Sequence, residues 1–197
     1  MQSKRRFMST ETLTLGAIMT AFVIILQCLA FYTNFFGPFA TAVALVPIVI
    51  GSALCGIWIG AWLGFVFGMV VLLTGGAALF FAFSIPGAII TVLVKGTACG
   101  FASGLTLKLM KRCNRYLSVT VASLICPIVN TGVFLLGSFV FFADYANAIA
   151  EACELEVSGM MVFFSLAMAN FLFEMLLSAL FIPVTVKLLN IRKKNVS

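Results

Sequence analysis

The sequence predicts an all-α, polytopic integral membrane protein with six transmembrane helices in a single domain that spans residues 1–197. Hydrophobic residues make up 63% of the chain, charged residues only 9%, and the mean hydropathy is +1.20. Soluble domains carry roughly 25% charged residues, so this composition excludes a soluble fold. The apolar residues also form separate runs of the right length, because about 20 helical residues cross a ~30 Å hydrocarbon core.

Glycine, proline and charged residues divide the apolar sequence into six runs. Asn34, Gly37 and Pro38 end the first run, Gly56 separates the second from the third, and the stretch from Gly75 to Pro86 separates the third from the fourth. A basic cluster ends the fourth, and an acidic stretch, Asp144 through Glu156, is expected to form an external loop after the fifth. We expect helices at about residues 12–32, 39–55, 58–79, 87–110, 117–142 and 159–189.

Two of these runs carry glycines at four-residue spacing. The third contains Gly60, Gly64 and Gly68, and the fourth contains Gly96, Gly100 and Gly104. Small residues at this spacing form a smooth stripe on which another helix can approach closely. The two runs are therefore expected to lie in tight helix–helix contacts.

The distribution of charge predicts the orientation in the membrane. All of the 12 Lys and Arg except Lys95 lie at the N-terminus, between the fourth and fifth helices, or at the C-terminus. With six spans these segments share one side, which the positive-inside rule makes cytoplasmic. We therefore expect a multi-pass protein of the cell (cytoplasmic) membrane with both termini in the cytoplasm. The basic residues serve topology and headgroup contact, so nucleic acid is not an expected partner.

Four polar residues inside the predicted spans are candidate substrate-binding residues. Lys95, Asn130, Asn170 and Glu174 lie on the fourth, fifth and sixth helices, at a depth of roughly 12–22 Å by helix rise. Asn170 and Glu174 are four residues apart and project from one helix face. Intramembrane charges are usually functional, and this group could bind a small polar molecule through charge-assisted hydrogen bonds. The alternatives are a self-satisfied polar cluster that holds helices together and, for Lys95, a charge that snorkels to the interface.

Catalytic residues, metal ligands and cofactors are not expected. The sequence has no histidine, and its six cysteines are scattered without CxxC pairs, mostly within apolar runs. It contains no Ser/His or Asp/Asp constellation, no HExxH and no Walker-type phosphate loop. Active transport by this chain would need an external source of energy.

The order of several segments resembles the substrate-binding S components of energy-coupling factor (ECF) transporters. The resemblance rests on LGAIMTA in the first helix, ALVPIVIGSALCGIWIGAWLGFVFG across the second and third, ITVLVKGTACGFASGL in the fourth, CPIVNTGVFLLGSFVFF in the fifth and ANFLFEMLLSALFIPVTVKLL in the sixth. It implies a substrate-capture subunit of an ECF-type ABC importer, which binds one micronutrient, commonly a B vitamin, from the external side. It also implies association with a transmembrane coupling subunit and two cytosolic ATPases.

The resemblance further implies a docking motif and a substrate group. An AxxxA motif in the first helix of the family docks on the coupling subunit, and Ala17 and Ala21 match it. The pattern is nearest to the pantothenate-like group, with a riboflavin-type subunit close behind; Lys95 favours an anionic substrate, although a direct pair with Glu174 would neutralise it. A secondary transporter that uses these two residues for proton coupling is the alternative, followed by a structural membrane-assembly protein. Asn34–Pro38 and Gly75–Pro86 could form a lid over the ligand or be ordinary connectors.

Overall fold

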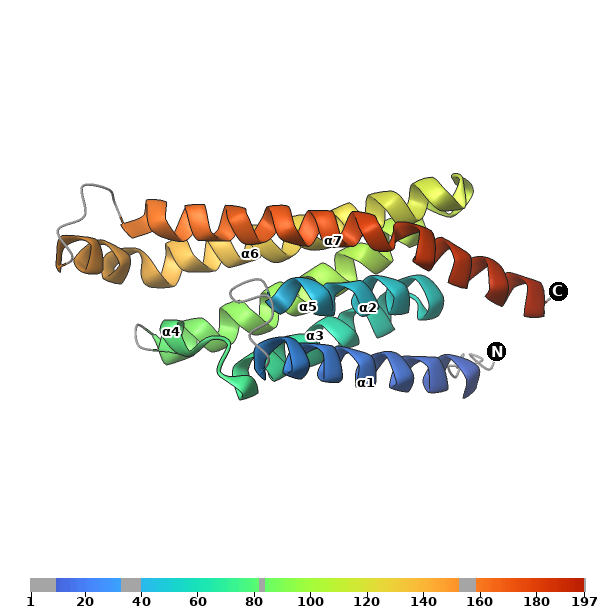
Figure 1. Cartoon of the computed structure of the whole chain (residues 1–197), viewed down its shortest axis with the longest axis horizontal. Coiled ribbons are helices and arrows are strands. Elements are labelled where there is room, and N and C mark those ends of the chain that lie inside the picture. The colour runs from blue at the N-terminus through green and yellow to red at the C-terminus, as the bar shows by residue number, and fades with distance from the viewer. Residues whose placement is uncertain (1–9, 33–39, 82–83, 153–158, 197) are drawn as a thin grey trace, which may run out of the picture.

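The computed structural model is a bundle of long helices (Figure 1). It describes residues 10–32, 40–81, 84–152 and 159–196, and these contain helices and no strand. In chain order the elements are α1 (Thr10–Tyr32), α2 (Ala40–Cys55), α3 (Ile57–Thr74), α4 (Ala78–Phe81), α5 (Ile85–Leu109), the short 3₁₀ helix η2 (Met110–Arg112), α6 (Arg115–Ala152) and α7 (Gly159–Val196). The all-α class predicted from composition is confirmed.

Five of the described helices, α1, α3, α5, α6 and α7, are long and apolar enough to cross a membrane. The sixth, α2, has 16 residues and is about 24 Å long at 1.5 Å per residue. It is nevertheless the central helix, because it packs against α1, α3, α5, α6 and α7. Leu45 and Ile48 of α2 are fully buried in the core with Leu63 and Phe67 of α3.

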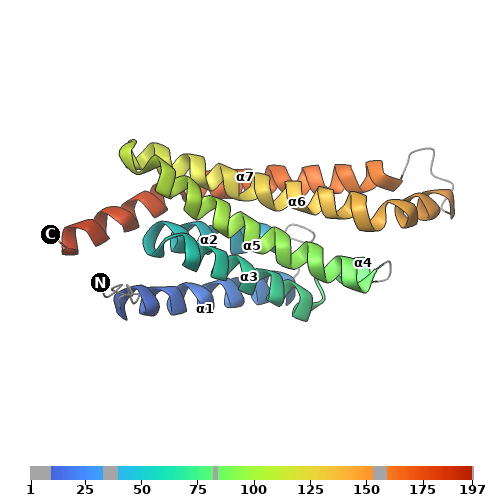
Figure 2. The same ribbon diagram turned by 180° about the vertical axis from the view of Figure 1, so that it is seen from behind.

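The arrangement of the helices places two basic regions, the α5–α6 connection and the end of α7, at the same end of the molecule as the start of α1. In Figures 1 and 2 the start of α1, the end of α7 and the connection between α5 and α6 lie at the same end. The helices α6 and α7 run side by side along most of their length, and α5 crosses beneath them toward α3 (Figure 1). Of the four predicted polar residues, Lys95 lies on α5, Asn130 on α6, and Asn170 and Glu174 on α7.

The glycines of α3 and α5 bring the two helix backbones into direct contact. A Cβ atom on Gly64 would collide with the carbonyl oxygen of Gly96, and one on Gly96 with the carbonyl of Gly64. Gly60 and Gly100 oppose each other in the same way one turn further along. The prediction that both glycine stripes serve close helix contacts is confirmed, and they pack against each other. This contact fixes the rotation of α5 and hence the direction in which Lys95 projects.

The connection between α3 and α5 differs from the prediction. Helix α3 ends at Thr74 rather than at residue 79, because Gly75 takes a left-handed conformation (φ 84°) and its N–H bonds back to the carbonyl of Leu72. The short helix α4 follows within the predicted loop. Helix α5 then begins at Ile85, where the Ser84 hydroxyl accepts a hydrogen bond from the N–H of Gly87 at 3.2 Å and caps the helix.

The last two helices are longer than predicted. Helix α6 continues to Ala152 rather than ending near residue 142, so Asp144 and Glu151 belong to a helix and the expected acidic loop is wrong for this part. Alanine is the best helix former, and the alanines of ANAIAEA explain the continuation. Helix α7 extends to Val196 rather than residue 189. The rest of the acidic stretch and the Asn34–Pro38 connection lie outside the described residues.

Candidate functional site: a buried polar cluster between α5, α6 and α7

Glu174 is the centre of a buried hydrogen-bonded cluster. Its side chain is fully buried in α7, and its carboxylate accepts hydrogen bonds from Asn130 Nδ2 at 2.9 and 3.2 Å and from Asn170 Nδ2 at 2.8 Å. Thr131 Oγ1 lies 3.5 Å from the same carboxylate. Hydrogen bonds to a charged group are the strong kind, so these donors compensate much of the cost of burying Glu174. Asn130, Asn170 and Glu174 thus meet, as their common depth predicted.

Lys95 borders this cluster from α5. Its side chain is 9% exposed, and Nζ lies over the ring of Phe134 of α6, 5.0 Å from the ring centroid. The Glu174 carboxylate acts on Lys95 electrostatically. The hydrogen bonds described for that carboxylate, however, come from asparagine and threonine side chains. A cation over an aromatic face is stabilised by the ring quadrupole. This contact does not use a hydrogen-bond acceptor for the N–H groups of the ammonium.

Helical spacing explains why these residues share one interface. On α5, Thr91, Lys95 and Cys99 follow one another at four-residue intervals and are all buried. The glycine stripe occupies the adjacent face of the same helix, and it faces α3. Helix α5 therefore uses one face for backbone contact with α3 and the next for polar side chains toward α6.

Further polar atoms in the membrane-spanning bundle are buried without a hydrogen-bond partner among the described residues. Asn130 Oδ1 is one of them, although the amide nitrogen of the same side chain bonds Glu174. The others on the three helices of the site are Thr91 Oγ1, Ser103 Oγ, Ser138 Oγ and Ser178 Oγ. Apart from Asn130, these residues were not among the predicted site residues. Thr91 lies four residues before Lys95, and Ser178 lies four residues after Glu174. This helical spacing is the sequence signal that could have indicated these two residues.

A comparison with known protein families identifies the family of this chain. The model of the family described as ECF transporter, substrate-specific component, matches residues 11–186. The chain belongs to this family. No curated protein and no solved structure matches it. As an S component, the protein is the substrate-specific subunit of an ECF importer, and its family is one of transporter subunits rather than enzymes.

The two alanines of the predicted docking motif lie on the outside of the S component. Ala17 and Ala21 are both exposed on α1. Gly16, next to Ala17, is buried, and a Cβ there would lie 3.3 Å from the Ile59 side chain of α3. Helix α1 thus packs on α3 through one face and presents the two alanines on another.

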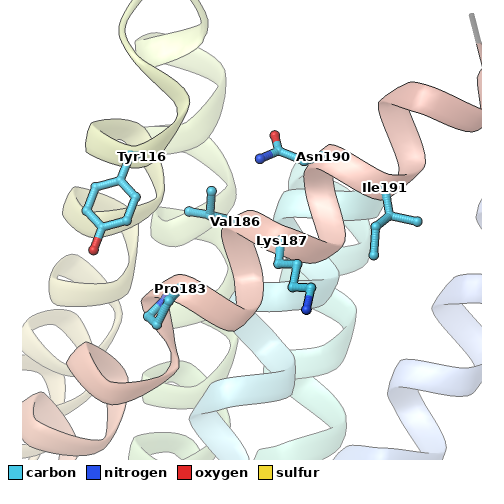
Figure 3. Close-up of a pocket in the computed structure, with 6 residues that line it drawn as sticks. All are labelled: Tyr116, Pro183, Val186, Lys187, Asn190 and Ile191. Carbon is cyan, nitrogen blue, oxygen red and sulfur yellow. The ribbon is translucent and has the colours of Figure 1, made fainter.

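The two cavities described for this S component lie away from the polar cluster. The smaller, about 380 Å³, is lined by Tyr116 of α6 and by residues of α7 that include Lys187 and Asn190 (Figure 3). The larger, about 850 Å³, is lined by residues near both ends of the α5–α6 connection. None of the four predicted substrate-binding residues lines either cavity. Among the described residues, no group of three or more Cys, Asp or Glu could hold a metal ion.

Proposed function

We propose that this S component captures a small anionic micronutrient, a B vitamin such as pantothenate, at the polar cluster between α5, α6 and α7. The observation that carries the proposal is the position of Lys95. It is a buried cation whose described contact is the ring of Phe134, next to a carboxylate that already accepts hydrogen bonds from two asparagines. Its ammonium group can therefore donate to a carboxylate of the ligand.

Each residue of the cluster has a proposed role. Lys95 contacts the anionic group of the substrate, and Asn130, whose Oδ1 has no partner among the described residues, accepts a hydrogen bond from a hydroxyl or amide of the ligand. Asn170 orients Glu174 by a hydrogen bond along the same helix. Glu174 tunes or shares the positive charge of Lys95. If Lys95 and Glu174 act together, the losses of substrate affinity in Lys95→Ala and Glu174→Ala will be less than additive.

The chemistry of pantothenate agrees with this set of groups. Pantothenate carries one carboxylate, an amide and two hydroxyls, so it presents an anion for Lys95 and both donors and acceptors for Asn130 and its neighbours. A riboflavin-type substrate is the second candidate, and a specific contact favours it. The rings of Phe80 and Phe134 form an edge-to-face pair with centroids 5.3 Å apart beside Lys95. A flat ring system could pack against such a pair.

The proposed partners are a transmembrane coupling subunit and two cytosolic ATPase subunits. We propose that the coupling subunit contacts α1 at Ala17 and Ala21, because two exposed alanines one turn apart allow close helix packing in a membrane. The chain functions as one membrane domain in the cytoplasmic membrane with both termini in the cytoplasm. The basic α5–α6 connection and the end of α7 lie at the same end of the bundle as the start of α1, which supports this orientation (Figure 1).

Uptake with and without the energising subunits tests this assignment. Affinity purification of the full chain from its native membrane should recover a membrane coupling subunit and two ATPases, and uptake of radiolabelled pantothenate should need ATP hydrolysis by them. Ion-dependent uptake by the chain alone in proteoliposomes would instead identify a secondary transporter in which Lys95 and Glu174 serve proton coupling. Binding of riboflavin but not pantothenate by the purified chain would select the second candidate substrate.

A further inference from the structure

The larger cavity lies at the end of the bundle where the basic α5–α6 connection is found. Its volume is about 850 Å³, and α1, α2, α3, α5, η2, α6 and α7 all contribute to its lining. The cavity is therefore a space between helices and not a depression on a single one. Neither the substrate site proposed above nor the α1 alanines take part in it.

The charged residues that line this cavity are all cationic. Lys108 lies on α5, Lys111 on η2 and Arg115 at the start of α6, and the polar residues Thr12, Ser52 and Ser118 line the same space. Glu11, the neighbour of Thr12, does not line it. Arg115 is held in place because its Nη1 donates to the carbonyl of Leu189 and to Asn190 Oδ1, each at 3.0 Å. An anion that entered would meet positive charge from three elements.

One rim of the cavity is aromatic and faces the surroundings of the bundle. Trp58 lines the cavity and is 79% exposed, and its ring packs edge-to-face on Phe101 of α5, with centroids 6.5 Å apart. Phe101 is itself exposed. Tryptophan is enriched where a membrane meets water, because its ring sits at the level of the lipid headgroups. The cavity thus adjoins a surface along which an acyl chain can lie.

We propose that this cavity binds the phosphate group of an anionic phospholipid, with Lys108 and Lys111 as its cationic ligands and the acyl chains beside Trp58 and Phe101. Basic pockets between transmembrane helices are a recognised form of headgroup site. A cationic cavity beside an exposed apolar rim favours a lipid over a soluble phosphate, because the phosphate ion has no apolar part to contact Trp58 and Phe101. A lipid bound here links the ends of α3, α5 and α6 and stabilises the folded bundle through its binding free energy.

Thermal unfolding of the purified full chain tests the proposal. The protein in a neutral detergent is titrated separately with phosphatidylglycerol, with phosphatidylcholine and with inorganic phosphate, and the apparent affinity is derived from the rise in Tm. The variant Lys108→Gln with Lys111→Gln should bind phosphatidylglycerol about thirtyfold more weakly, because each basic residue near an anionic lipid contributes about fivefold. The matched control, Arg112→Gln with Lys187→Gln, removes two charges at the same end from residues that do not line this cavity, and it should bind like the wild type.

A second readout does not depend on stability. Cys113 is exposed and lines the cavity. Phosphatidylglycerol should therefore slow the alkylation of Cys113 by a maleimide more than it slows the alkylation of Cys28 on α1. Peptide mass spectrometry measures both rates. Equal effects of phosphatidylglycerol and phosphatidylcholine would overturn the proposal, as would equal losses in the two double variants. If inorganic phosphate alone gives the same protection, the lipid assignment is wrong. Protection of Cys113 only by a co-purified coupling subunit would show that a protein, and not a lipid, fills the cavity.

Discussion

Replacement of Lys95 by methionine separates a binding role from a structural one. A buried ammonium costs at least about 2.5–3.5 kcal/mol on insertion scales, and the cation–π contact with Phe134 returns up to about 2 kcal/mol when desolvated. Methionine has an unbranched, flexible side chain that is one atom shorter than that of lysine, and it removes the charge. The difference favours methionine by at least about 0.5–1.5 kcal/mol, and the lost attraction between Lys95 and Glu174 opposes it, so stability should stay close to that of the wild type. Affinity for the substrate should fall, because a hydrogen bond to a charged group contributes about 1.5–3 kcal/mol, or one to two decades.

Glu174→Gln is the matched comparison for Lys95→Met. The glutamine side chain has a similar shape, but one carboxylate oxygen becomes an NH₂ donor, and it then faces the amide donors of Asn130 and Asn170. Leaving a buried donor unsatisfied costs about 1–3 kcal/mol, so this variant should be less stable than the wild type. Unfolding in one detergent and equilibrium binding of radiolabelled vitamin measure the two effects. The reasoning fails if Lys95→Met aggregates while Glu174→Gln folds normally, or if folded Lys95→Met binds with wild-type affinity.

The other predictions concern the helix contacts. Gly64→Ala should destabilise the bundle by about 1–3 kcal/mol, because its methyl group meets the backbone of α5. Gly132→Ala should be neutral or stabilising by up to about 1 kcal/mol, because a Cβ there meets nothing within 4 Å. Equal unfolding transitions for the Gly64→Ala and Gly132→Ala variants would contradict the contact between α3 and α5. Ala17→Trp or Ala21→Trp should leave vitamin binding intact and abolish uptake with the energising subunits. Transport at the original rate in both tryptophan variants would place the docking surface elsewhere.

The six apolar runs of the sequence correspond to α1, α2, α3, α5, α6 and α7, whereas the short helices α4 and η2 were not predicted. The six long helices and their tight glycine contacts were predictable because both depend on local features. The length of an apolar run is enough to identify a membrane-spanning helix. Glycines at four-residue spacing mainly serve to let two membrane helices approach closely. The end of α3 was misplaced because apolar residues continue through LLTGGAALF, whereas the left-handed backbone of Gly75 decides the boundary. The length of α6 was missed because its polar stretch resembled a loop, although its alanines favour a helix.

The candidate site was predictable only in part. The contact between Asn170 and Glu174 follows from their spacing on one helix, and the structure contains it. The bond from Asn130 to Glu174 depends on how α6 and α7 are rotated about their axes, which no single-helix pattern encodes. The position of Lys95 over Phe134 depends in the same way on the packing of α5 against α6, which the glycine contact with α3 helps to set.

Mass spectrometry of the small molecules retained by the purified full chain tests the central claim most directly. Wild-type protein and the Lys95→Met variant are isolated in parallel, washed in the same neutral detergent and denatured to release what they hold. We predict that the wild type retains an anionic vitamin, near one molecule per chain, and that the variant loses it during washing while remaining folded. Retention of the same molecule by both proteins in equal amounts would contradict a substrate site at Lys95.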